Sequence, residues 1–255
     1  MREFDKQYEL GFWNSFGEKH KKETTIYPEE YKDSEILSFA CTQTSLSTKE
    51  QNKLVDKWCA FLPTLKNVKY LFFYSRINQN IFDSICKVTN LEGLWIKWGA
   101  IKHLNSISNL RKIRHLYLGS SSQVESIESL IDLGTLNGLH LENFKKINSF
   151  RELTTLNELT ELGIFGSIWT CQSIDTVTYL ADFKGLKYLD LSNTRIKDKN
   201  IRILANLKDL EFLSLPFWYP KSDFEYLFNN LPNLKKGAPI TVMTDEEFCK
   251  MMNIK

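Results

Sequence analysis

The chain has 255 residues, of which 42% are hydrophobic and 25% are charged, as is ordinary for a folded globular protein. Its 33 basic and 31 acidic residues leave a net charge of +2, which gives no support for nucleic acid or an anionic membrane as a partner. No apolar run approaches the ~20 residues of a membrane-spanning helix, and residues 1–22 contain no apolar stretch of the signal-peptide type. We therefore expect a cytoplasmic protein that does not bind membranes.

The cysteines also favour an intracellular protein. There are five of them, widely spaced and without a CxxC pair: Cys41, Cys59, Cys86, Cys171 and Cys249. An odd number with this spacing suits reduced thiols that pack as small hydrophobic side chains.

Residues 1–66 are predicted to form an N-terminal cap. The first 34 residues are rich in aromatic side chains, namely Phe4, Tyr8, Phe12, Trp13 and Phe16. They favour a segment packed on the first turn of the fold, with a partner-binding arm as the alternative. Residues 35–40 (EILSFA) predict a strand. Ser47 and Glu50 have capping-box spacing for a helix with one apolar face, which carries Leu54, Val55, Trp58 and Leu62.

From residue 62 onward, apolar residues recur in a five-point pattern of three steps of three followed by a step of two. The fourth point of each pattern, which we call the anchor, is Leu71, Leu94, Leu116, Leu139, Leu162, Leu189 and Leu213, at intervals of 22 to 27 residues. The step of two predicts a short strand with alternate residues buried. The steps of three predict a 3₁₀ or α-helical turn that runs back on the opposite side.

This pattern resembles the leucine-rich-repeat family, whose consensus is LxxLxLxxNxL, over roughly residues 60 to 236; the stretch LKYLDLSNTRI fits nearly every position. The period is most similar to that of the short-repeat, internalin-like class. The resemblance implies an α/β fold, a curved right-handed solenoid with a parallel concave sheet and short helical turns on the convex side. We predict seven repeats over residues 67–236 in a single domain, because stacked turns bury one continuous core.

One family position departs from the consensus. In the family the consensus Asn bridges neighbouring turns, but here it is replaced by Arg76, Gly99, Ser121, Phe144, Ser167, Thr194 and Trp218. Ser and Thr can substitute in part, whereas Phe144 and Trp218 cannot, so we expect less regular turns there.

Residues 237–255 are predicted to close the C-terminal end. Gly237 occupies the next anchor position and Pro239 cannot donate to a strand ladder, so repetition stops. Thr244 and Glu247 have capping-box spacing for a short final helix. The longest repeat carries extra residues around GSIWTCQSID, which predict a protruding loop with Trp169 near its tip.

Catalytic signals are poor, because the sequence has no GxSxG, glycine-rich phosphate loop or HExxH motif. We therefore predict a protein that is not an enzyme and needs no cofactor. A metal-dependent enzyme that uses His115, His140 and Glu142 is a less favoured alternative, since their spacing is not typical of metal ligands.

The outward positions of the predicted strands are the informative ones, because stacking does not require them to be apolar. The first three strands expose many aromatic rings, and free rings of roughly 150–250 Å² each would exceed the apolar patch normal for a monomer. Carboxylates follow in the second half of the sheet. We predict a partner-binding face made of Tyr70, Phe72, Tyr74, Trp95, Lys97, Trp98, His115, Tyr117, His140, Glu142, Phe165, Tyr188, Asp190 and Phe212.

Two structural explanations compete with partner binding. The rings can stack across strands and only stiffen the sheet, or the N-terminal segment can fold over them. Binding is favoured, because stacking alone does not explain why the aromatic residues crowd the first half.

The sequence therefore predicts a protein that binds another protein through its concave face. One concrete hypothesis is a bacterial immunity protein, a cytoplasmic inhibitor that holds a toxin. A secreted effector or adhesin is the competing specialisation, and glycan binding through Trp95 and Tyr117 is a third possibility.

Overall fold

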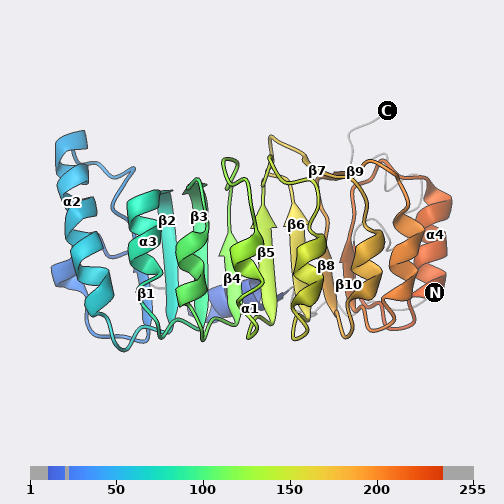
Figure 1. Cartoon of the computed structure of the whole chain (residues 1–255), viewed down its shortest axis with the longest axis horizontal. Helices are drawn as coiled ribbons and strands as arrows, with labels where there is room; N and C mark the ends of the chain where they lie inside the picture. Colours follow the sequence, from blue (N-terminus) through green and yellow to red (C-terminus); the bar gives the residue numbers. More distant parts are fainter. Residues whose placement is uncertain (1–10, 21–22, 238–255) are drawn as a thin grey trace.

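The computed structural model describes residues 11–20 and 23–237, which form a single-file stack of turns (Figure 1). The main sheet has eight strands, all parallel and paired in the order β1-β2-β3-β4-β5-β6-β8-β10. Their bounds are Ile36–Phe39, Tyr70–Asn78, Gly93–Ala100, His115–Leu118, Gly138–Glu142, Glu161–Phe165, Tyr188–Asp190 and Phe212–Ser214. A second, two-stranded parallel sheet joins β7 (Gln172–Ile174) to β9 (Thr194–Ile196).

Helical segments line the other side of the stack, facing the viewer in Figure 1. They are α2 (Thr48–Phe61), α3 (Gln79–Ile85), α4 (Lys221–Asn230) and the 3₁₀ helices η2 (Leu62–Thr64), η3 (Asn105–Asn109), η4 (Glu128–Leu130), η5 (Arg151–Thr155), η6 (Thr178–Asp182) and η7 (Ile201–Asn206). A further 3₁₀ helix, η1 (Pro28–Glu30), precedes β1. The helix α1 (Gly11–Lys19) is the exception, because it lies behind the strands in this view. No helix in the described ranges has the length and apolar character to cross a membrane.

The anchors fix the register of the sheet. Each of the seven predicted anchor leucines pairs with the next across the sheet, from Leu71 to Leu213, and Leu37 of β1 adds an eighth. All eight are buried, with at most 1% of their surface exposed. A slip of one residue would turn every anchor out of the core, so the apolar pattern specifies the pairing. The predicted leucine-rich-repeat solenoid is confirmed.

Polar side chains bridge turns where the consensus Asn is missing. Thr194 is fully buried, and its hydroxyl donates to the carbonyl of Ile164 at 2.8 Å. Phe144 fills its turn with a buried ring, and the amide of Gln172 donates to the Phe144 carbonyl at 3.2 Å. Trp218 instead points outward and is 56% exposed. Where the residue at the consensus Asn position cannot bridge, a side chain from a neighbouring turn therefore hydrogen-bonds to the backbone instead, or the position is exposed to solvent.

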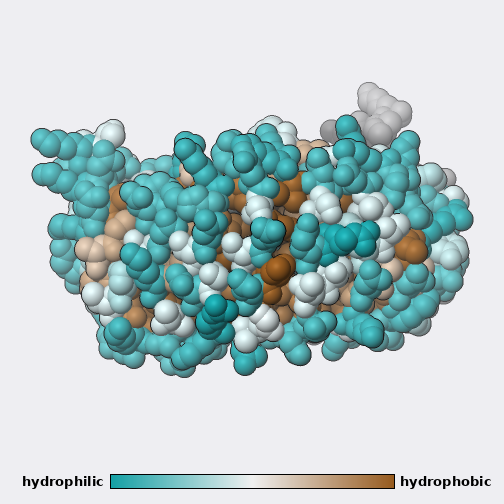
Figure 2. All heavy atoms as spheres, in the orientation of Figure 1, coloured by the Kyte–Doolittle hydropathy of each residue, from teal (hydrophilic) through white to brown (hydrophobic). Residues whose placement is uncertain are grey.

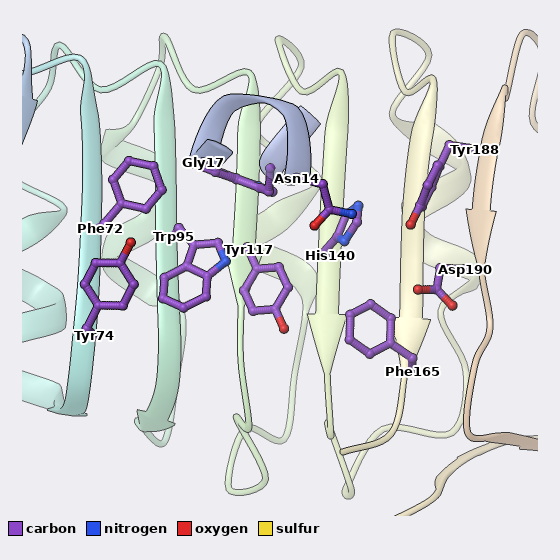
Figure 3. Close-up of a pocket in the computed structure, with 11 residues that line it drawn as sticks. Asn14, Gly17, Phe72, Tyr74, Trp95, Tyr117, His140, Phe165, Tyr188 and Asp190 are labelled. Atoms are coloured by element: carbon purple, nitrogen blue, oxygen red, sulfur yellow. The ribbon is translucent and has the colours of Figure 1, made fainter. Parts of the chain in front are cut away.

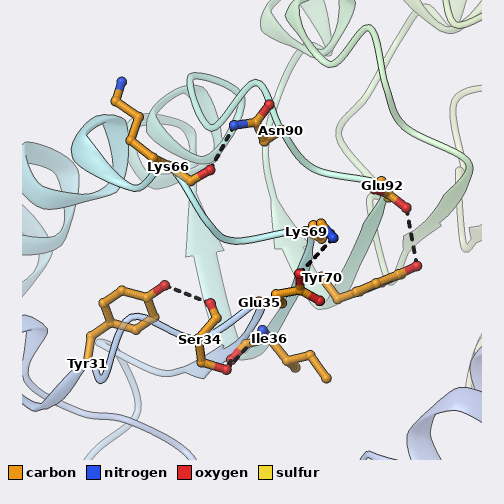
Figure 4. Close-up of polar contacts among 9 residues, drawn as sticks. All are labelled: Tyr31, Ser34, Glu35, Ile36, Lys66, Lys69, Tyr70, Asn90 and Glu92. Carbon is orange, nitrogen blue, oxygen red and sulfur yellow. Dashed lines mark hydrogen bonds and ion pairs between the residues drawn. The ribbon is translucent and has the colours of Figure 1, made fainter.

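Polar contacts also join successive turns at the edge of the sheet (Figure 4). Lys69 forms an ion pair of 2.7 Å with Glu35, and Tyr70 donates to Glu92 at 3.4 Å. The amide of Asn90 donates to the carbonyl of Lys66 at 2.8 Å. Such exposed pairs contribute little energy each, so they tune the alignment of the turns while apolar burial holds the stack.

The two ends of the stack are closed in different ways. At the first end the predicted strand is β1, and α2 begins with the predicted capping box, in which Ser47 accepts from the Glu50 amide. At the other end Gly237 lies against β10, where an added Cβ would come within 2.0 Å of the Leu213 carbonyl oxygen. A leucine anchor cannot fit at this position, so the repeat stops. Pro239, Thr244 and Glu247 lie outside the described residues.

The extra residues of the longest repeat form the predicted protruding loop. Ile168 and Trp169 are 89% and 92% exposed at its tip. The loop is held at its base, where the Asn193 amide donates to the carbonyls of Ser167 and Thr170. The protrusion is shorter than expected, because Gln172–Ile174 is the buried strand β7.

The convex side is largely hydrophilic. Figure 2 shows polar atoms over the helical turns, with hydrophobic atoms visible in the strips between them. No broad apolar surface is visible on this side in Figure 2, so the concave face is the candidate for an apolar binding surface.

The core anchors are expected to dominate stability. Leu139→Ala removes a fully buried side chain from the central strand β5, and it should lower the free energy of unfolding by about 2–5 kcal/mol in urea denaturation. Ile131→Ala is the matched control, because Ile131 is 39% exposed on the neighbouring helical turn, and its loss should stay within about 0.5 kcal/mol. Equal losses in both variants would contradict the assignment of the anchors.

Candidate functional site

The helix α1 lies across the concave face, in front of the strands in the view of Figure 3. Its sequence GFWNSFGEK places aromatic residues at positions 12, 13 and 16, which share one side of a helix. These rings meet side chains of β2 and β4, so the helix spans several repeats. Helices laid in a groove by such anchors are a recurrent mode of recognition, here within one chain.

Ring contacts fix α1 on the sheet. Phe12 stacks on His115 with a centroid distance of 3.5 Å and an angle of 5° between the rings. Trp13 meets Phe72 edge to face at 5.4 Å, and Phe16 lies 4.4 Å from Tyr70. Trp13 and Phe72 are buried as a result, with 8% and 6% exposed.

A buried carboxylate holds the start of the helix. The backbone amide of Phe12 donates to Glu161 Oε2 at 2.9 Å, and His140 Nε2 lies 2.6 Å from Glu161 Oε1. A carboxylate at the first turn of a helix is favoured by the free amides and the helix dipole. Burial acts to raise the pKa of Glu161, but the contact with His140 and the Phe12 amide outweigh it and lower the pKa. The carboxylate is therefore charged and fixes α1 to β6.

Small residues make room for this contact. Gly11 has φ +76°, and a Cβ there would lie 2.7 Å from Glu161 Oε1. At Gly93 a Cβ would lie 2.6 Å from the Tyr70 ring and 3.0 Å from Trp13. The close approach of α1 to the sheet depends on these positions.

The structure corrects the expectation for the N-terminal segment. The aromatic residues Phe12, Trp13 and Phe16 do not pack on the first turn; they cover the concave face from β2 to β6. The competing explanation, that the N-terminal segment folds over the rings, holds for Tyr70, Phe72 and His115. Phe72 in particular belongs to the internal packing and is not a free surface residue.

Beyond α1 the concave face keeps an open aromatic strip, which we define as Tyr74, Trp95, Tyr117 and Phe165. The rings run across β2, β3, β4 and β6, and Figure 3 shows them nearly face-on. Tyr74 is 38% exposed, and the other three are partly exposed. Their centroids are 5.1, 5.3 and 6.2 Å apart in sequence order, so the rings also contact one another across strands as the stacking explanation expected, with Trp95 and Tyr117 stacked and the other two pairs tilted.

Polar groups border the open aromatic strip. Tyr117 donates to Glu142 at 3.0 Å, and Asp190 accepts from the Ser192 amide at 2.8 Å. Burial raises the pKa of the Tyr117 hydroxyl, and Glu142 adds to this effect. Lys97 is exposed, with its ammonium 4.3 Å above the ring of Trp98.

The remaining predicted site residues are closed off. Tyr188 and Phe212 stack with centroids 4.3 Å apart, and both are 7% exposed. His140 stacks on Tyr188 at 5.6 Å and is 6% exposed. The expectation that these three side chains are available on the surface is corrected, because their rings bury one another.

The metal alternative finds no support in the geometry. His115 and His140 lie near Glu161, whereas Glu142 is engaged with Tyr117. Within the described residues no three His, Cys, Asp or Glu side chains are grouped as a metal would require. Glu161, which the sequence reasoning left out of the site, is the carboxylate that meets the histidines. Glu161 lies in register across the sheet with Gly138, His115 and Gly93. This alignment of small residues with a histidine is the signal that could have pointed to it.

The stacked parallel strands, aligned anchors and helical turns define a leucine-rich-repeat solenoid of the internalin-like type. Among solved structures, the chain is similar to an internalin C2 of Listeria monocytogenes strain 4b F2365, with 23% identity and a TM-score of 0.53 over 69% of this chain and 73% of that one. At this identity the likeness shows the fold alone.

Two further structures are similar to the same share of the chain, 69%. An internalin (InlF) of the same Listeria strain is 22% identical with a TM-score of 0.49, covering 69% of this chain and 56% of that one. The ectodomain of the Arabidopsis thaliana receptor kinase GASSHO1/SCHENGEN3, solved with CASPARIAN STRIP INTEGRITY FACTOR 2, is 16% identical with a TM-score of 0.43, covering 69% and 24%. No protein-family model matches the chain, and no curated protein does.

The contact between Gly11 and Glu161 provides a test of α1 docking. Gly11→Ala places a Cβ against the carboxylate at a positive φ, so α1 should detach while the solenoid stays folded. Gly17→Ala is the control on the same helix, because a Cβ there meets nothing within 4 Å. Hydrogen exchange of the α1 amides should accelerate in the first variant only. Unchanged exchange in Gly11→Ala would contradict the docked position.

The half-buried imidazole of His115 makes stability depend on pH. Burial lowers its pKa from 6.5 to about 4, although Glu161 acts in the opposite direction. Between these values the unfolded chain binds more protons than the folded one, so the free energy of unfolding should fall as the pH drops. His115→Gln should flatten this slope in urea denaturations at several pH values. The pKa of Glu161 is lowered from its ordinary value of 4.5. The stability that this carboxylate contributes is therefore lost only as the pH falls below 4.5, in a more acidic range than the effect of His115.

Proposed function

We propose that this chain is a binding protein that takes another protein on the open aromatic strip. The observation that carries the proposal is a row of partly exposed rings on four strands, beyond the reach of α1. The core is complete without these rings, because the anchors on the opposite side of each strand are already buried. Stacking between such rings stabilises the sheet by only roughly 0.2–1 kcal/mol per pair. Other turns have smaller residues on this face, so the fold does not require the rings.

The chemistry of the strip suits a folded, partly polar partner. Aromatic residues are the commonest anchors of protein interfaces, and polar groups at the rim give orientation. Glu142 borders the strip through its hydrogen bond with Tyr117, Lys97 lies near enough to Glu142 to act on its pKa, and Asp190 lies beside Phe165 in Figure 3. A rigid solenoid presents these groups in a fixed arrangement, which reduces the entropy lost on binding.

The more specific hypothesis is a cytoplasmic inhibitor, such as a bacterial immunity protein that covers a toxin. A preorganised surface that binds one target tightly is what such a role requires. The alternative is a secreted effector or adhesin-type binder. Fractionation of the native cells distinguishes them: the inhibitor would be retained in the cytoplasm with its target, and the effector or adhesin would be found outside.

The central ring of the strip should be a main source of affinity. Trp95→Ala should weaken binding of the protein partner by about 2 kcal/mol or more, because the substitution removes the contact between the large indole ring and the partner. Calorimetry with the partner identified by the capture experiment below measures this loss. The variant should fold normally, since Trp95 is partly exposed and lies outside the core.

Capture from native lysate with a Trp95→Ala, Tyr117→Ala double variant identifies the partner. Tyr226→Ala is the matched control, because Tyr226 is 40% exposed on α4, away from the strip. A partner that binds the control but not the double variant supports the proposal. A partner that binds all three proteins equally would place the interface elsewhere.

A further inference from the structure

A cavity of about 390 Å³ lies between α1 and the open aromatic strip. Trp13, Asn14 and Gly17 of α1 line one side of it, and Figure 3 shows Asn14 and Gly17 on the helix in front of the strands. The sheet supplies the floor, with the strip rings, Tyr188 and Asp190 among its lining. The volume falls in the range of small-ligand sites, and the site is mostly aromatic with few polar groups, as such sites are.

The charge facing this cavity is negative. Asp190 lines it directly and accepts a hydrogen bond from the neutral Ser192 amide. Glu142, at the edge of the strip, accepts hydrogen bonds from the hydroxyls of Tyr117 and Ser120 at 3.0 and 3.4 Å. Within the described ranges neither carboxylate forms an ion pair. Lys97 is the neighbouring cation, and its ammonium lies over Trp98.

The other titratable groups around the cavity do not reverse this sign. His115 is neutral near pH 7, because burial lowers its pKa to about 4. Glu161 is charged and in contact with His140, which itself lines the cavity. Burial raises the pKa of Glu142, with the hydrogen bonds from Tyr117 and Ser120 acting against it, and this carboxylate is not part of the cavity lining, whereas Asp190 is. Asp190 is therefore the carboxylate placed to face a ligand.

We propose that this cavity binds an organic cation, an alkylammonium or guanidinium group, held against the faces of Tyr117 and Phe165 with Asp190 as its counter-charge. Aromatic faces attract cations through their quadrupole. Anionic ligands are opposed by both carboxylates, and a purely apolar ligand would leave Asp190 desolvated without compensation.

The inference rests on the proposed function, in which the cation is a lysine or arginine side chain of the protein partner. A free quaternary ammonium compound presents the same chemistry. The two sources are separated by the probes: Nα-acetyl-lysine amide and Nα-acetyl-arginine amide for the side chains, and choline for the free compound.

The test is an NMR titration of the purified full-length chain, with the tryptophan indole signals as readout. Choline is compared with 3,3-dimethylbutan-1-ol, a neutral molecule of the same shape. The cation should bind at least tenfold more tightly than the neutral isostere. Preference for one of the amino-acid amides over choline assigns the site to a protein side chain, and the reverse preference assigns it to a free compound.

Asp190→Asn should weaken binding of the preferred cation about tenfold, because it removes the charge while keeping the acceptor oxygen. Asp198→Asn is the matched control: Asp198 also accepts from the amide two residues ahead, at 3.1 Å, but in an exposed turn. The affinity of the Asp198→Asn variant for the preferred cation should equal that of the wild-type chain.

Three results would overturn the inference: no binding by any cation, equal affinity for the neutral isostere, or undiminished affinity in Asp190→Asn. These leave the proposed function intact if the Trp95→Ala, Tyr117→Ala variant still loses its partner. Conversely, cation binding without a partner that depends on these rings would keep the site and remove the protein-binding proposal.

Discussion

The alignment of one leucine per turn is the constraint on which the structure depends. A single turn has an apolar edge that it cannot bury alone, and only a neighbour in matching register covers it. The run from Leu37 to Leu213 shows eight turns that obey this rule. Because alternation assigns the core to one side of each strand, the residues between the anchors are free for other work.

Those free positions are divided between two tasks. The half of the concave face nearest the strand starts receives α1, whose rings and first amide meet His115 and Glu161. The half nearest the strand ends keeps the open aromatic strip, with Asp190 at its border. The helix is thus part of the site, since Trp13 closes one side of the cavity that the strip floors.

The sequence was sufficient for features set by local or repeating patterns and poor for features set by contacts between distant segments. The anchors, the capping box of α2 and the loop at Trp169 follow local rules, and each was predictable. The placement of α1 was not, because its contact with Glu161 joins residues 149 positions apart and leaves no periodic trace. Burial of Phe72 was missed for the same reason, because Trp13 of α1 lies on top of it. Tyr188 is instead buried by the rings of His140 and Phe212 on the same sheet. Whether Trp95 and Asp190 contact a partner remains a prediction.

The strap formed by α1 also bears on how the molecule folds. Contacts in a solenoid join each turn to its neighbours, so such chains can nucleate in several places and lose their ends one turn at a time. The bond between Phe12 and Glu161 closes a loop over β2 to β6 that is longer than the loop closed by any strand pairing, so it costs somewhat more chain entropy. It can form only after those turns are assembled, and once formed it makes their separate unravelling less favourable. A short helix therefore converts a string of semi-independent units into one cooperative block.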